Sequence, residues 1–122
     1  MKPDEAKALL GQALFLDVRE PDEWDSGHVE GSIHIPIREI TERVDELDTS
    51  MQIVVVCQVG QRSELVAEWL SAQGVDAHNL EGGLMSWSAQ GLPLTAPENP
   101  SGQVVDGWAR DISGNRLNPD ED

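Results

Sequence analysis

Short apolar runs alternate with amphipathic segments along the first 94 residues of the chain. Four of these runs have the length and the apolar character of buried strands, and they occupy residues 14–18, 33–35, 52–57 and 76–80. The segments around them favour helices. These helices are expected at residues 3–10, in a single turn at 23–26, and at 37–47, 64–73 and 84–90.

Local signals refine three of these helices. Between residues 37 and 47 apolar side chains recur at three- and four-residue steps, which predicts one continuous amphipathic helix. Asp22 is expected to cap the turn at 23–26. Ser63 is expected to cap the helix at 64–73. In that later helix the expected buried stripe consists of Leu65, Val66, Trp69 and Leu70, and Trp24 and Trp87 are also assigned to the core.

The order of the elements indicates the fold class. Strands that are separated by helices predict an α/β domain, because parallel strands require crossover connections that helices usually supply. We therefore expect a three-layer architecture, with a mainly parallel sheet of four to five strands and helices on both faces. This domain should span residues 1–94.

After Pro93 the composition changes. Residues 95–122 contain three Pro, three Gly, six acidic and two basic residues, and no helical or strand period persists there. The segment is an acidic C-terminal tail by composition. Its few apolar residues, among them Val105 and Trp108, leave two interpretations open, a solvated tail and a loosely packed arm or docking segment.

Charge and cysteine content limit the classes of function. The 122 residues include 8 Lys+Arg and 23 Asp+Glu, so the formal net charge is −15. This balance argues against nucleic acid and anionic membranes as partners, since both are bound through clustered basic residues. With one cysteine no internal disulfide can form. We expect neither a signal sequence nor a membrane-spanning segment, since the first residues form no apolar run and the longest such run, residues 53–57, is too short for a bilayer. A cytoplasmic protein is the default expectation.

Cys57 lies where a parallel sheet commonly binds ligands, beyond the carboxyl end of the most strand-like segment. A lone cysteine is more often a small buried hydrophobe than a nucleophile. Here, however, a short loop joins it to a helix start, and Gly60 permits the tight backbone that turns successive N–H groups toward the sulfur. The helix N-terminus and Arg62 would both favour a thiolate. The loop could therefore activate Cys57 and hold an anion beside it.

Three sequence blocks resemble the rhodanese-like domain family. Residues 16–24 (LDVREPDEW) and 27–36 (GHVEGSIHIP) are similar to the family's first signature, and residues 80–87 (LEGGLMSW) to its closing L-x-G-G-x-x-x-W motif. Residues 54–63 (VVVCQVGQRS) resemble its active-site loop, commonly C-R-x-G-x-R-S. The resemblance covers about residues 3–94 and implies a parallel α/β rhodanese-like fold.

The resemblance also implies a mechanism. Cys57 would be the catalytic residue and would carry sulfane sulfur as a persulfide, received from thiosulfate or another small anionic donor, or from a protein. The acceptor would be cyanide, a thiol or a protein. The substrate-binding residues would be those of the loop, namely Gln58, Val59, Gly60, Gln61, Arg62 and Ser63. No cofactor or metal is expected.

The chain departs from the family pattern in two places. Gln58 replaces the arginine that many members carry directly after the cysteine, so the loop is less cationic and thiosulfate should bind more weakly. Members often begin with a short edge strand, whereas this chain starts almost at its first helix. We therefore expect that strand to be short or missing.

The remaining polar residues favour structural roles. Asp17 and Arg19 flank a strand end and are interpreted as a buried or half-buried pair that fixes the following turn. His28 is expected to hydrogen-bond the backbone of its own turn, and His34 to be partly buried. The two histidines have no third ligand at metal spacing.

Three other functions compete with a thiosulfate sulfurtransferase. A persulfide carrier fed by a protein donor would use the same cysteine. A non-catalytic binding module would need none of the loop residues. A phosphatase of related fold would separate its cysteine and arginine by five residues, whereas only four separate Cys57 from Arg62.

Overall fold

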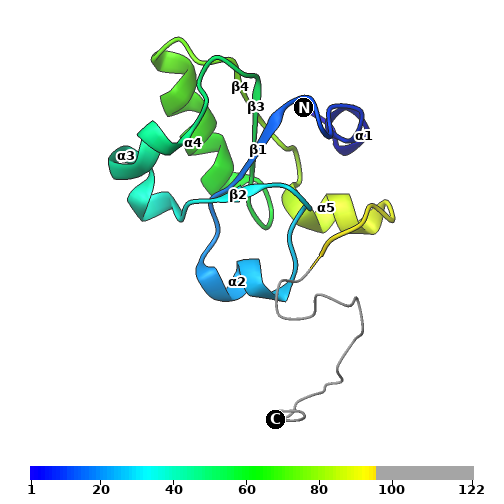
Figure 1. The fold of residues 1–122 in the computed structure, drawn as a ribbon. Coiled ribbons are helices and arrows are strands. Elements are labelled where there is room, and N and C mark those ends of the chain that lie inside the picture. Colours follow the sequence, from blue (N-terminus) through cyan, green and yellow to red (C-terminus); the bar gives the residue numbers. More distant parts are fainter. Residues whose placement is uncertain (96–122) are drawn as a thin grey trace.

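The computed structural model describes residues 1–95 of the chain, shown as the coloured ribbon in Figure 1. Its strands are β1 (Leu14–Asp17), β2 (Ile33–His34), β3 (Ile53–Val56) and β4 (Ala77–Asn79). Its α-helices are α1 (Pro3–Lys7), α2 (Pro21–Ser26), α3 (Ile40–Arg43), α4 (Gln61–Ala72) and α5 (Gly83–Ala89). Two short 3-10 turns, Ile37–Glu39 and Val44–Glu46, flank α3.

The four strands form one parallel sheet in the order β2-β1-β3-β4. Leu16 is in register with both Ile33 and Val55, so β1 is paired on both sides. The α/β fold class and the parallel sheet are thus confirmed. Of the four to five strands expected, residues 1–95 form four. In these residues no edge strand precedes α1; instead the backbone of Met1 exchanges hydrogen bonds with Asn79 and Glu81 at the β4 edge.

Alternate side chains of the sheet build a core on each face. All four residues of β3 are fully buried, because side chains alternate between faces and both faces are covered. Val55 packs in one cluster with residues of α3 and α4, such as Leu70, whereas Val54 packs in the other with Phe15 and Trp87. Figure 1 shows α3 and α4 on one side of the strands and α1 and α5 on the other, which gives the expected three layers.

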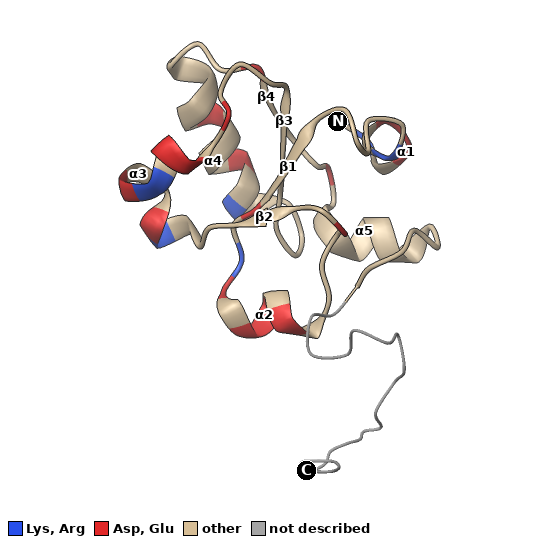
Figure 2. Cartoon of the chain, viewed as in Figure 1, with Lys and Arg blue, Asp and Glu red and all other residues tan. Residues whose placement is uncertain are grey.

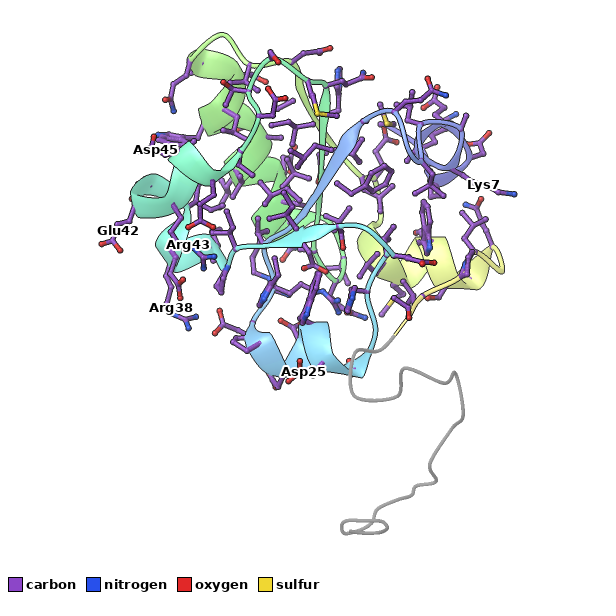
Figure 3. All side chains as sticks on the ribbon, in the orientation of Figure 1. Lys7, Asp25, Arg38, Glu42, Arg43 and Asp45 are labelled. Carbon is purple, nitrogen blue, oxygen red and sulfur yellow. The ribbon has the colours of Figure 1, made fainter. Side chains whose placement is uncertain are left out.

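The segment expected as one helix at residues 37–47 is broken. Its α-helical part, α3, is four residues long and lies between the two 3-10 turns. Ile40 and Leu47 still face the core, so the apolar periodicity was a correct guide to burial but not to helix type. Glu42 and Asp45, labelled in Figure 3, project away from the sheet.

Two cap assignments in the other helices are wrong, and one buried stripe is half right. Helix α4 begins two residues before Ser63, because Gly60 takes the cap position, and Glu20 rather than Asp22 precedes α2. In α4 the buried side is formed by Ser63, Val66, Ala67 and Leu70, while Leu65 is 63% and Trp69 36% exposed. Val66 and Leu70 are thus buried as expected, whereas the small residues Ser63 and Ala67 are buried in place of Leu65 and Trp69.

The described part of the chain ends beside α2. Thr95 forms an isolated antiparallel bridge with His28, donating its N–H and accepting that of His28. Of the tail predicted at residues 95–122, Thr95 is described and the remaining residues, 96–122, lie outside the described residues. Of the helices in residues 1–95, none combines the length and the apolar character that a membrane crossing requires.

Candidate active site

Cys57 directly follows β3 and its side chain is completely buried. Its Sγ accepts hydrogen bonds from the N–H of Gly60 at 3.1 Å and from the N–H of Ser63 at 3.4 Å. The hydroxyl Oγ of Ser63 lies 3.2 Å from the same sulfur. Three donors from the loop and the first turn of α4 thus converge on one buried sulfur atom.

Gly60 is the residue that lets the loop turn toward the sulfur. Its φ is +99°, a left-handed conformation that residues with a Cβ rarely adopt, and it caps the N-terminus of α4. A Cβ at this position would lie 3.3 Å from the backbone nitrogen of Gly82. The prediction that Gly60 shapes a tight loop therefore has a geometric basis.

The environment of Cys57 has opposing effects on its thiol. Burial raises the pKa, because it penalises the charged form, whereas the hydroxyl of Ser63 and the backbone N–H groups of Ser63, Gly60 and Val59 lower it. The hydrogen bonds outweigh burial, so the pKa of Cys57 lies below its ordinary value of 9.0. The site thus makes the thiolate, which is the nucleophilic form of cysteine, easier to form than in an ordinary cysteine.

Helix α5 supports the loop through backbone hydrogen bonds. Leu84 donates its N–H to the carbonyl oxygen of Cys57 at 2.9 Å, and Met85 donates to that of Gln58 at 3.0 Å. A Cβ on Gly83 would lie 2.5 Å from the carbonyl carbon and oxygen of Gln58, so only glycine allows α5 to approach this closely. The L-x-G-G-x-x-x-W motif at residues 80–87 thereby fixes the backbone that carries the sulfur.

Arg62 points at helix α2. Its guanidinium donates to both carboxylate oxygens of Glu23, at 2.8 and 3.0 Å. The hydrogen bonds from Arg62 lower the pKa of Glu23 most, and the backbone N–H of Glu20 and the charge of Arg62 lower it further, while burial opposes them; the pKa is about 2, below the ordinary value of 4.5. The charge of Arg62 is therefore neutralised by an acid of another element, and not by Glu64 or Glu68 of its own helix. Figure 2 shows the acidic residues of α2 in red; they are three of the six residues of this helix.

The pair predicted at the end of the first strand is present and buried. The Nε of Arg19 donates to Asp17 Oδ1 at 3.0 Å and its Nη2 donates to Oδ2 at 2.9 Å, with both side chains at most 3% exposed. Arg19 also donates to the carbonyl of Gly27 at 2.6 Å and to Gln58 Oε1 at 3.3 Å. The pair thus holds the chain before α2 next to the first residue of the loop.

His28 makes the backbone contact that was expected of it. Its Nδ1 lies 2.9 Å from the carbonyl oxygen of Trp24, and its ring stacks on the Trp24 indole at 3.4 Å between centroids. His34 stacks on the same indole at 4.8 Å and contacts the carbonyl of Arg19. Trp24 is therefore half-buried in a surface stack and does not belong to the core.

The remaining loop side chains open to the surface. Val59 is 46% exposed and Gln61 is exposed, whereas Gln58 is half-buried against Arg19. Within residues 1–95 no cluster of three His, Cys, Asp or Glu side chains is placed to hold a metal.

Sequence reasoning missed Glu23 and Asn79. Glu23 is 39 positions from Arg62 in the sequence, so no local pattern joins them. Asn79 lies at the carboxyl end of β4, next to the end of β3, and accepts a hydrogen bond from Ser63 through Oδ1. Its place at this edge of the sheet was the one available signal, because ligand sites gather at the carboxyl ends of parallel strands.

The geometry can be compared with known proteins. A model of the rhodanese-like domain matches residues 2–90, which include the whole sheet and the loop around Cys57. The chain belongs to the rhodanese-like domain family. The resemblance of the three sequence blocks is thereby confirmed.

Relatives of this rhodanese-like domain include proteins named as sulfurtransferases. A protein of Bacillus subtilis named putative sulfurtransferase YtwF is 36% identical over 82 residues, covering 67% of this chain and 80% of that protein. The thiosulfate sulfurtransferase GlpE of Pseudomonas syringae is 36% identical over 87 residues, covering 70% of this chain and 82% of GlpE. The chain is therefore a member of a rhodanese-like family that contains sulfurtransferases.

Solved structures agree with the fold. The crystal structure of a rhodanese-related protein from Thermoplasma volcanium has a TM-score of 0.75 and 34% identity, covering 78% of this chain and 95% of that one. The parallel sheet with helices on both faces is thus the rhodanese-like fold in three dimensions.

Proposed function

We propose that the chain is a sulfurtransferase that carries sulfane sulfur as a persulfide on Cys57. The convergence of three hydrogen-bond donors on the sulfur of Cys57 is the observation that supports this most directly. Such donors stabilise a thiolate, and the same N–H groups could hold the terminal sulfur anion of a persulfide. GlpE, a relative at 36% identity, carries the name thiosulfate sulfurtransferase.

The proposed reaction consists of two displacements at sulfur. In the first, the Cys57 thiolate attacks the outer sulfur of thiosulfate, the sulfur–sulfur bond of the donor breaks, and its electron pair leaves with sulfite. In the second, a nucleophile such as cyanide or a thiolate attacks the outer sulfur of the Cys57 persulfide and restores the thiolate. Both steps conserve charge without a proton transfer, so no general base is required.

The site offers little attraction to a dianionic donor. The two cations nearest the loop, Arg62 and Arg19, are each bound to a carboxylate, of Glu23 and Asp17 respectively. Gln58 adds no charge where many family members have an arginine. The proposal therefore includes persulfides of thiols or of proteins as donors beside thiosulfate, and a protein as an acceptor.

A carrier function fed by another protein is the second candidate. A relative in Bacillus subtilis, 36% identical over 77 residues, is named putative sulfur carrier protein YrkF, although the match covers only 42% of that protein. The neutralised cations at the loop favour this alternative over turnover of free thiosulfate. Either function requires Cys57 as a free thiol, as it is in the structure, and a reducing compartment such as the cytoplasm would maintain it.

Mass spectrometry of the intact protein tests the proposal. Since Cys57 is the one cysteine of the chain, any persulfide can be assigned to it without further mapping. We expect a gain of one sulfur atom with thiosulfate or cysteine persulfide, its removal by cyanide, and no gain in Cys57→Ser. A gain with cysteine persulfide alone would favour the protein-fed carrier. No gain with either donor would overturn the proposed function.

A further inference from the structure

Asn79 is a polar side chain at the edge of the candidate site. It takes no part in the two displacement steps proposed above. It lies at the end of β4 and is half-buried. Its Nδ2 donates to the carbonyl oxygen of Gly60 at 3.2 Å, which orients the amide so that Oδ1 faces Ser63. Asn79 therefore contacts the loop at one atom and the hydroxyl beside the sulfur at the other.

The hydroxyl of Ser63 has two acceptors and one hydrogen. Its oxygen lies within hydrogen-bond distance of both Cys57 Sγ and Asn79 Oδ1. A hydroxyl donates one hydrogen at a time, although its oxygen can also accept. The two contacts can thus both be hydrogen bonds only if Cys57, as a thiol, donates its own hydrogen to Ser63.

The direction of this chain of contacts depends on the charge of the sulfur. With a thiol, Cys57 donates to Ser63 and Ser63 donates to Asn79. With a thiolate, the sulfur has no hydrogen to give, and the Ser63 hydroxyl turns to the charged sulfur because hydrogen bonds to ions are the stronger ones. Asn79 Oδ1 then loses its donor.

We propose that Asn79 is a positioning residue for Cys57, whose carboxamide oxygen competes with the sulfur for the single hydroxyl hydrogen of Ser63. The competition favours the resting thiol, and the hydroxyl swings to the sulfur when Cys57 becomes anionic. The inference rests on the proposed role of Cys57 as the reactive thiol. It assigns to Asn79 control over how readily that thiol becomes a nucleophile.

Other charged groups near the loop are engaged in pairs of their own. Arg62 of α4 is bound to Glu23 of α2, and Arg19 to Asp17. Helix α5 carries no charged residue, and on β4 the side chain of His78 contacts Asp76. The imidazoles on the α2 side, His28 and His34, stack on Trp24. Ser63 is thus the side chain through which Asn79 reaches the sulfur.

Two substitutions at position 79 separate this role from a structural one. Both Asn79→Leu and Asn79→Asp remove the donor to Gly60, so loosening of the loop would affect both in the same direction. For the competition with sulfur they are opposites: leucine cannot accept the Ser63 hydrogen, whereas an aspartate accepts it more strongly and adds negative charge. The net value of one neutral hydrogen bond corresponds to about a three- to tenfold change in an equilibrium constant.

The measurement is the rate of alkylation of Cys57 by iodoacetamide as a function of pH, without any sulfur donor. We expect Asn79→Leu to raise the thiolate fraction about three- to tenfold below the midpoint, and Asn79→Asp to lower it. In a Ser63→Ala background the effect of Asn79→Leu should disappear. His78→Gln, on the opposite face of the same strand, serves as the matched control and should leave the midpoint unchanged.

Shifts in the same direction for Asn79→Leu and Asn79→Asp would overturn the proposal, as would a leucine effect that persists without the Ser63 hydroxyl. If Asn79→Leu does not fold, Asn79→Ala takes its place, because truncation also removes the acceptor and cannot overpack the site. The assay reads the thiol directly. Failure of sulfur transfer would therefore contradict the proposed function and leave this result standing.

Discussion

Replacing Asp17 by asparagine tests whether the buried pair holds the domain together. The carboxylate accepts from the backbone N–H of Arg19 at 3.0 Å as well as from its guanidinium, and it is completely buried. The new side chain would have nearly the same volume, so packing is conserved. What changes is that the positive charge of Arg19 stays in the interior without its counter-charge, and an amide NH₂ faces guanidinium donors.

The structure implies a large effect for this small change. Removing one partner of a buried ion pair costs about 3–5 kcal/mol, out of a total stability of about 5–15 kcal/mol for a domain. At about 4–8 °C per kcal/mol for a domain of this size, the melting temperature should fall by at least about 12 °C. With a urea m-value of about 1.5 kcal/mol/M, the unfolding midpoint should fall by at least about 2 M.

Equilibrium unfolding in urea, followed by circular dichroism and tryptophan fluorescence, is the assay. Glu46→Gln is the matched control, because it also neutralises a carboxylate that binds an arginine, Arg43 at 2.8 Å, but on the exposed surface. The control should unfold like the parent protein. A loss below about 1 kcal/mol in Asp17→Asn, with an unchanged m-value, would refute the argument that Arg19 depends on this carboxylate.

Two further predictions concern the loop and its ion pair. Gly83→Ala should destabilise the domain and slow alkylation of Cys57, since the new Cβ would lie 2.5 Å from the carbonyl of Gln58; equal alkylation rates and melting temperatures would contradict this. The Glu23–Arg62 pair should stabilise the folded protein at neutral pH and lose this contribution in acid. The pKa of Glu23 falls from 4.5 to about 2 on folding, so the contribution is complete above about pH 4.5 and is lost as the pH drops toward 2. The stability difference between the parent protein and Glu23→Gln, measured in urea at about pH 7 and about pH 3, should therefore narrow at the lower pH; a constant difference would speak against the pair.

The sequence predicted those features that depend on neighbours along the chain. A continuous β-branched run is sufficient to place β3 in the centre of a parallel sheet, and thus Cys57 at its carboxyl end. The pair of Asp17 and Arg19 was also predictable, because the two residues flank one strand end. These features need no knowledge of the rest of the molecule.

The missed features depend on contacts between distant segments or on competing local preferences. Arg62 and Glu23 meet only once α2 is folded over the loop. Ser63 has the side chain of a helix cap, but Gly60 starts α4 earlier with its left-handed backbone, and Ser63 then faces the sulfur from inside the first turn. Helix propensity alone cannot decide between two such positions.

The support from α5 has a consequence for altering the site. The loop is held by backbone groups, through the N–H of Leu84 and Met85 bound to the carbonyls of Cys57 and Gln58. Val59 and Gln61, by contrast, direct exposed side chains outward. A combinatorial library at positions 59 and 61 could therefore vary the exposed chemistry of the loop while the backbone that carries the thiol keeps its place, and under the proposed function such a library would test donor preference.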